Sequence, residues 1–462
     1  IFMENNMELN KKSISRQSVI TTAILAVLSF LPFFPGFYRY ITIAISALML
    51  LLFFGDEFYL MIGVFMFFYE QLIFSAGNPA YRIFSYLLLI KVFFFQPKKI
   101  KLNVIFLPTF LIILLYCAFA LINADVSVYV QQFLQRGQIP PSAFEINFRI
   151  VLTTIFDILF VYLIAHIVNG DTTLFEKICR IFIISAIISG LYGIFSGNTM
   201  GYFLGYSATG EIRVTRYRGT FPDPNYASFF YNMALFMLIS LKNIFKNKYV
   251  RIILVFALYF LIIAAASITG FLCNLLALAL YIIIKYKKKS PLILFVAAAL
   301  ISAIILSVIY IPPVRNLSII KNIEIRIQNQ YLEGDVSDSD ALTSGRTRQW
   351  RLYWDYFKKQ DSFKKAFGGN IVSTSNFDPY FAKNFKRMPH NAYLGFLLNF
   401  GVLGTIFIMG AWIIKNIMYF IRYKKEQNSA LVAIILCNFI WFFYGAALDY
   451  FADWKFFFFY FL

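Results

Sequence analysis

Apolar runs close to 20 residues long recur along the whole chain, and they restrict its fold more than any other feature. A helix needs about 20 mostly apolar residues to cross the hydrocarbon core of a bilayer. The chain is 60% hydrophobic and only 14% charged, whereas soluble domains carry about a quarter charged residues. The sequence therefore predicts an all-α, polytopic membrane protein.

The apolar runs predict about 13–14 transmembrane helices. Their expected ranges are 18–34, 37–55, 58–74, 81–96, 102–122, 149–168, 178–196, 225–241, 250–266, 268–284, 291–311, 390–414, 428–446 and 454–462. A basic stretch before the first run imitates a signal peptide, but no small-residue cleavage pattern follows, so we expect this helix to be retained. The chain then divides into eleven helices at 1–311, a large loop at 312–389 and C-terminal helices at 390–462.

Short basic loops alternate along the chain with lysine-poor ones. The basic loops are 11–16, 98–101, 242–251, 285–289 and 421–426. The positive-inside rule places them, and the N-terminus, in the cytoplasm. Loops 123–148, 197–224 and 312–389 then face the outer compartment. The net charge of +19 is interpreted through this topology, and no nucleic-acid partner is expected.

The loop at 312–389 holds 13 basic residues against 8 acidic ones. This excess favours an anionic partner on the outer face, with lipid headgroups as the simpler explanation. Within the loop, Trp350, Tyr353, Trp354 and Phe357 follow helical spacing, with basic residues on the other arc. Such a helix either lies in the membrane interface or caps the bundle as a lid.

The loop at 197–224 ends in a candidate anion site. Arg213, Arg216 and Arg218 precede a helix start that is marked by Asp223 as N-cap and Pro224 as first helical residue. Free amides and the positive end of the helix dipole, beside arginines, favour phosphate.

The chain has only two histidines. His390 is predicted in the first turn of an outward-facing helix that starts at Pro389. A helix N-terminus disfavours a second positive charge, so we expect a neutral imidazole that can accept a proton. An interfacial hydrogen-bonding role is the alternative. His166 lies at the opposite end of its span and is interpreted as structural.

Other polar residues inside the apolar runs are few. An acid is costly there, so Asp157 and Glu70 are candidate functional residues, with a neutral or paired structural role as the alternative. The cysteines form no CxxC pair and are interpreted as packing residues: Cys117, Cys179, Cys273 and Cys437. No metal-ligand set is visible, and no metal or other cofactor is expected.

Four motifs occur in a recognisable order: "RGTFPDPNYAS", "SGRTRQW", "FGGN" and "PHNAYLGFLLNFGVLG". From about Arg213 to Trp412, the chain resembles the O-antigen polymerase and O-antigen ligase superfamily of bacterial surface-glycan enzymes. There are two departures from the family pattern. Gly368-Gly369-Asn370 stands where Gly-x-Gly is usual, and the large loop holds a single histidine.

The resemblance implies a GT-C-like membrane glycosyltransferase that needs no metal. It would polymerise undecaprenyl-pyrophosphate-linked oligosaccharides, as donor and acceptor, into a surface polysaccharide such as O-antigen or capsule. The site would lie on the outer, periplasmic side of the bacterial cytoplasmic membrane. Membrane lipid, a chain-length regulator and a flippase would be its partners.

The resemblance also assigns roles to single residues. It implies that His390 is the catalytic residue and that Arg216, Arg218 and Arg346 hold the pyrophosphate. Supporting roles fall to Asn225, Asn391 and Tyr393.

Several alternatives stay open at this point. An O-antigen ligase or a protein oligosaccharyltransferase would use the same donor. A proton-coupled transporter or a flippase for lipid-linked glycans would account for the intramembrane acids. A receptor or scaffold for envelope enzymes would account for the apolar bulk but not for the loop arginines.

Overall fold

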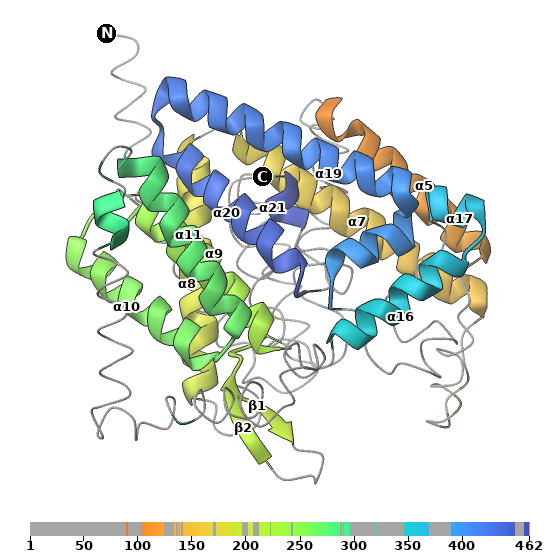
Figure 1. Cartoon of the computed structure of the whole chain (residues 1–462), viewed down its shortest axis with the longest axis horizontal. Coiled ribbons are helices and arrows are strands. Elements are labelled where there is room, and N and C mark those ends of the chain that lie inside the picture. Colours follow the sequence, from red (N-terminus) through yellow and green to blue (C-terminus); the bar gives the residue numbers. More distant parts are fainter. Residues whose placement is uncertain are drawn as a thin grey trace.

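The computed structural model describes residues 89–90, 104–123, 134, 137, 139, 142–169, 172–195, 202–206, 212–221, 223–241, 244–286, 289, 291–295, 321, 346–368, 390–448 and 457–461. Its elements are η3 (Val104–Phe106), α5 (Leu107–Asn123), α7 (Ala143–Asn169), α8 (Thr172–Phe195), β1 (Tyr202–Tyr206), β2 (Ile212–Tyr217), α9 (Pro224–Ser240), α10 (Lys248–Ala264), α11 (Ile268–Tyr286), α16 (Arg346–Lys359), α17 (Ser362–Phe367), α19 (Ala392–Glu426), α20 (Ser429–Gly445) and α21 (Phe457–Phe461). This part of the chain is a helical bundle with one β-hairpin (Figure 1).

The helices α5, α7, α8, α9, α10, α11, α19, α20 and α21 fall on the spans predicted at 102–122, 149–168, 178–196, 225–241, 250–266, 268–284, 390–414, 428–446 and 454–462. Among the described residues, α11 and α19 are long and apolar enough to cross a membrane. The architecture is that of an all-α membrane protein. The spans predicted before residue 102, together with Glu70, lie outside the described residues except for residues 89–90.

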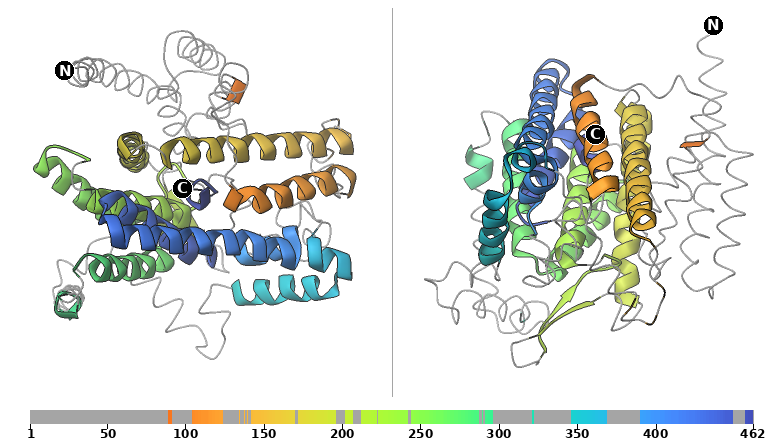
Figure 2. Two further views of the ribbon diagram at one scale, coloured as in Figure 1. Left: turned by 90° about the horizontal axis from the view of Figure 1, so that it is seen from above. Right: turned by 90° about the vertical axis from the view of Figure 1, so that its right-hand side faces the viewer.

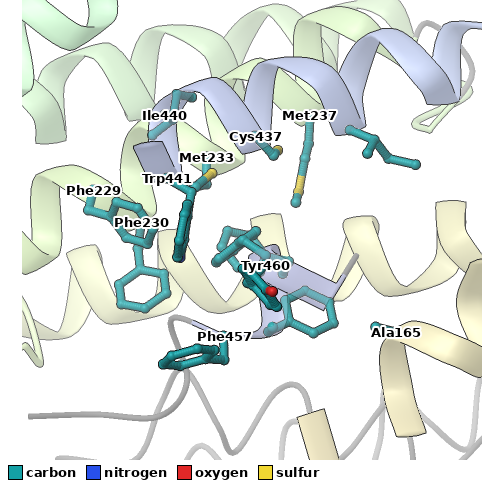
Figure 3. Packing of buried hydrophobic residues seen from close by; sticks show 14 of the residues in the cluster. Ala165, Phe229, Phe230, Met233, Met237, Cys437, Ile440, Trp441, Phe457 and Tyr460 are labelled. Carbon is teal, nitrogen blue, oxygen red and sulfur yellow. The ribbon is translucent and has the colours of Figure 1, made fainter. Parts of the chain in front are cut away.

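The helix α9 forms the centre of the bundle. Its sequence is apolar on all sides, as expected for a helix surrounded by others, and it packs against α8, α10, α11 and α20. The aromatic core lies beside it. The rings of Trp441 on α20 and Tyr460 on α21 lie side by side (Figure 3), with centroids 5.6 Å apart. Phe229 on α9 contacts Phe459 of α21, also with centroids 5.6 Å apart. Around this core, α5, α7 and α19 run lengthwise beside one another (Figure 2).

Buried polar contacts tie the central helices together. Asn232 on α9 donates its side-chain amide to the Ser228 carbonyl (2.9 Å), the Gly270 carbonyl (3.3 Å) and the Tyr444 hydroxyl (3.2 Å). It also accepts from the Asn274 amide at 2.8 Å. Because a buried polar group without a partner is costly, this network specifies how α9, α11 and α20 pack.

Lys415 of α19 is an ammonium group buried inside the bundle, with 4% of its surface exposed. Its Nζ donates to Asn438 Oδ1 (2.8 Å) and to the carbonyls of Tyr460 (2.6 Å) and Phe459 (3.2 Å). These hydrogen bonds replace those that the buried ammonium group would make with water. They also join α21 to α19 and α20.

Two predictions about residue environments can be compared with the bundle. The four cysteines are buried and free, which confirms them as packing residues. Asp157 lies mid-way along α7 and is 3% exposed, as an interior acid should be. His166 lies in the last turn of α7.

The helix α19 is broken at Gly401, whose φ of 66° and ψ of −174° are outside the helical region. A Cβ added there would lie 2.4 Å from the Ala366 carbonyl, and one added at Gly368 would lie 2.1 Å from the Asn399 carbonyl. The backbone of α17 and the residue after it therefore rest directly on the break. This contact joins the motifs "FGGN" and "NFGVLG".

Several boundaries differ from those predicted. α7 starts at Ala143, inside the predicted loop 123–148, and α19 continues to Glu426. The loop predicted at 197–224 contains the antiparallel hairpin β1–β2, in which Phe203 pairs with Arg216. The hairpin projects from one end of the bundle in both orientations (Figures 1 and 2). A two-stranded hairpin has a weak sequence signal because its alternation is short.

Candidate functional site

The side chain of Arg216 is held at the base of the hairpin. It is 9% exposed. Its Nε donates to the Ala265 carbonyl (3.2 Å), and its Nη2 donates to Asn225 Oδ1 (3.2 Å). Ala265 follows α10, and Asn225 lies in the first turn of α9. The guanidinium is therefore fixed between the end of α10 and the start of α9.

Asn225 is oriented in turn by Ser267. The Ser267 hydroxyl donates to Asn225 Oδ1 (2.8 Å) and accepts from the Gly270 amide (3.1 Å) in the first turn of α11. Ser267 follows Ala266, which has a φ of 46°. The break between α10 and α11 thus positions the site. Sequence reasoning missed Ser267, although a serine immediately before a helix is a typical N-cap.

The start of α9 confirms the predicted cap. Asp223 is the N-cap, its carboxylate accepts from the Asn225 amide (2.7 Å), and Pro224 begins the helix. The expectation of free amides at this end needs correction, however. Pro224 has no N–H, and the amide of Asn225 is bound to Asp223. Recognition of an anion here therefore falls mainly to arginine side chains.

Arg346 is the first residue of α16 and is half-buried. Burial lowers the pKa of its guanidinium, while the charges of Asp223 and Tyr226 raise this pKa. The large loop therefore brings Arg346 within electrostatic range of the α9 start. The motifs "SGRTRQW" and "FPDPN" are neighbours in the fold.

Arg218 completes the basic group. It directly follows β2, is half-buried, and accepts from the Phe221 amide through its carbonyl (3.1 Å). Gly219 next to it has a φ of 58°, and Thr220 is anchored to Ser189 on α8 by a 2.5 Å hydroxyl contact. A tight turn thus joins the arginines of the hairpin to the bundle. Arg213 lies within β2.

His390 lies at the entry of α19, but not in its first turn as predicted. The helix begins at Ala392, and Asn391 is its N-cap, accepting from the amides of Tyr393 (3.0 Å) and Leu394 (3.2 Å). An asparagine side chain caps a helix well, so the helix starts after it. His390 precedes the cap, is half-buried, and has a φ of 48°. A positive φ is uncommon for a residue other than glycine and is often found at functional sites.

Tyr393 fixes the start of α19 against α20. Its hydroxyl donates to the Phe442 carbonyl, and its ring lies against Gly445. Asn391 and Tyr393 therefore fix the start of α19, the helix that His390 precedes.

The predicted site residues thus form two groups. Arg216, Asn225 and Arg346 lie around the start of α9, with Arg218 two residues after Arg216, whereas His390 precedes Asn391 and Tyr393 at the start of α19. The helix α16 links the groups, because it begins with Arg346 and packs its Tyr353 and Phe357 against Leu398 of α19. In Figure 1, α16 and the first half of α19 begin in the same region and run alongside each other.

Residues 252–409 match the O-antigen ligase family. The resemblance to the O-antigen polymerase and ligase superfamily is confirmed. The match covers about a third of the chain and includes α10, α11, α16, α17 and the first half of α19. Members of this O-antigen ligase family are bacterial membrane proteins and glycosyltransferase-like enzymes that act on lipid-linked polysaccharides. No curated protein matches the chain.

Proposed function

We propose that the chain is a membrane glycosyltransferase that polymerises undecaprenyl-pyrophosphate-linked oligosaccharides into a surface polysaccharide. It would act on the outer face of the bacterial cytoplasmic membrane. The observation that carries this proposal is the convergence of Arg216 and Arg346 at the start of α9. A guanidinium fork matches the oxygen geometry of phosphate.

In the proposed reaction, the bond between the anomeric carbon and the pyrophosphate oxygen breaks. Pyrophosphate is already a good leaving group, so it needs charge stabilisation rather than a proton donor. Arg216 is held rigidly by Ala265 and Asn225, and such preorganised donors stabilise developing charge at little reorganisation cost. Arg218 and Arg346 add to the positive field.

The acceptor hydroxyl forms the new glycosidic bond and loses its proton. His390 is assigned to remove that proton, which contributes about 10²–10⁴-fold in rate for general-base catalysis. Its place at the mouth of α19 disfavours a charged imidazole, and its left-handed backbone is fixed by the Asn391 cap that follows.

The test uses the purified full chain with a defined polyprenyl-pyrophosphate oligosaccharide. We expect chain growth both with and without EDTA, because the proposed chemistry uses no metal. His390→Ala and Arg346→Ala should slow extension, and Arg218→Lys should do so as well, because a point charge lacks the guanidinium fork. Normal extension by both alanine variants would refute the proposal.

An O-antigen ligase is the second candidate, favoured by the description of the matching family. A ligase would use the same donor site but transfer a finished glycan to lipid A core or to a protein. Supplying each acceptor in turn with one labelled donor separates the two. Label on a growing lipid-linked glycan identifies a polymerase, whereas label only on lipid A core or protein identifies a ligase.

A further inference from the structure

We propose that α17 and the part of α16 from Trp350 onward form an interfacial anchor, residues 350–367, which docks on anionic phospholipid headgroups of the outer leaflet. This proposal concerns a surface outside the glycosyl-transfer site and does not depend on the chemistry there.

The anchor has one side packed on protein and one side exposed. Tyr353 and Phe357 are buried against Leu398 of α19. On the other side, Trp354, Phe363 and Phe367 leave 44%, 54% and 37% of their surface exposed. Exposed aromatic rings are typical of the membrane–water boundary, where an amphipathic ring has both an apolar and a wet neighbour.

The same side carries the positive charge of the anchor. Lys358, Lys359 and Lys364 are exposed. Residues 350–367 contain five basic residues against two acidic ones, and both acids, Asp355 and Asp361, already lie beside Lys358 (2.8 Å) and Lys364 (3.8 Å). The remaining excess complements an anionic leaflet, whose surface potential attracts nearby Lys and Arg side chains.

The position of the anchor along α19 favours lipid over a second protein. The residue after α17 touches the α19 break at Gly401. Immediately beyond the break, α19 shows a series of exposed apolar side chains: Val402, Leu403, Ile406, Phe407, Ile413, Ile414, Ile417, Met418, Phe420 and Ile421. On a membrane-spanning helix, these residues face lipid tails. The anchor therefore lies at the end of this apolar surface, where headgroups begin.

The full-length protein in nanodiscs, one copy per disc and without substrate, tests the proposal. The discs contain phosphatidylglycerol brominated close to the headgroup, and the fluorescence of the native chain is compared with that of Trp354→Phe. We expect the Trp354 contribution to be quenched by the brominated lipid and shielded from aqueous acrylamide. Quenching by acrylamide alone overturns the proposal, and protection from both quenchers assigns the face to a protein and overturns it as well.

The charge contribution is tested on the same signal. Lys358→Gln/Lys359→Gln/Lys364→Gln should reduce the quenching of Trp354 in anionic discs, and the effect should disappear in zwitterionic discs. The matched control is Lys424→Gln/Lys425→Gln, at the far end of α19, which should leave the Trp354 signal unchanged. Equal quenching in the triple variant and the native chain contradicts an electrostatic anchor. If the native chain fails to extend a lipid-linked donor in a separate assay while Trp354 is quenched as expected, the proposed function fails and the anchor stands.

Discussion

Among single residues, Arg216 shows how hydrogen bonds hold a charged side chain in one orientation inside an apolar bundle. Its guanidinium bridges the Ala265 carbonyl and Asn225 Oδ1. Asn225 in turn is oriented by the Ser267 hydroxyl. Each bond fixes one rotamer of the next group, so the charge is placed before any ligand arrives. A donor that is already oriented stabilises developing charge more effectively than a mobile one.

Removing the Ser267 hydroxyl should therefore weaken donor use without removing any charge. One hydrogen bond of this kind is worth about 0.5–1.5 kcal/mol, so Ser267→Ala should raise the KM for the lipid-linked donor by roughly 2- to 12-fold. Ser267→Thr keeps the hydroxyl and should restore the native value. Steady-state kinetics with a defined donor measures both, and an unchanged KM in the alanine variant would show that the positioning is not used.

Some of these residues could be predicted from the sequence, and some could not. The Asp223 cap and Pro224 start follow from local preferences, and they are found as predicted. The proximity of Arg346 to the start of α9 depends on how the large loop folds back on the bundle. The local sequence pattern carries no information on that long-range contact. His390 was predicted in the first turn of α19, but it lies before the helix because Asn391 is the N-cap.

Among the elements, the broken helix α19 has the clearest mechanical consequence. Gly401 adopts a backbone conformation that other residues avoid, and Gly368 and Ala366 rest against it. The break thus gives α17 a docking point on α19. Helix periodicity predicted a continuous span here, since a single glycine in an apolar run is compatible with an unbroken helix.

Adding a methyl group at this contact should disturb it. Gly401→Ala should destabilise the protein by about 1–3 kcal/mol, because its φ is strained for alanine and the new Cβ meets the Ala366 backbone. Gly410→Ala is the matched control in the same helix, since nothing lies within 4 Å of the added Cβ. Thermal unfolding in detergent compares the two. Equal melting temperatures would contradict the docking contact.

The cap of α17 should respond to acid. The Lys364 amide donates to Asp361 and lowers the pKa of this carboxyl. A lowered folded-state pKa gives stability that is present above the unfolded value, about 3.9, and is lost as the pH falls through the folded value. Hydrogen exchange at residues 362–367, corrected for intrinsic rates, should therefore rise in that acidic range. Asp361→Asn still caps but does not titrate, so its exchange should lack this rise.

Across the whole molecule, a few buried polar contacts fix the arrangement of mainly apolar helices. Lipid tails are as apolar as leucine, so burying apolar surface does little to choose among packings in a membrane. The hydrogen bonds of Asn232 and Lys415 select one packing of the helices, and those of Lys415 also hold α21 in the bundle. Hydropathy places the helices along the chain but gives no information on which ones are neighbours.

Replacing Asn232 should loosen the central helices. Asn232→Leu would remove the acceptor of the buried Asn274 amide and the donor to the Gly270 carbonyl and Tyr444 hydroxyl, at a cost of about 1–3 kcal/mol. Asn416→Leu is the comparison, because within the described residues that side chain donates only to the Trp412 carbonyl of its own helix (2.8 Å). Reversible unfolding in mixed detergent measures the difference. If both variants lower the free energy of unfolding equally, the Asn232 network does not determine how the central helices pack.

The most direct measurement is a double-mutant cycle for binding of the undecaprenyl-pyrophosphate donor, with Arg216→Lys, Arg346→Lys and the double variant. Each lysine keeps the charge but loses the fork, so each single variant should bind about tenfold more weakly, or about 1.4 kcal/mol. Because both guanidiniums contact one diphosphate, the losses should deviate from additivity by at least about 0.5 kcal/mol. Arg351→Lys, exposed on α16, should bind as the native chain does. Native affinity in either site variant, or strictly additive losses, would contradict a shared pyrophosphate site.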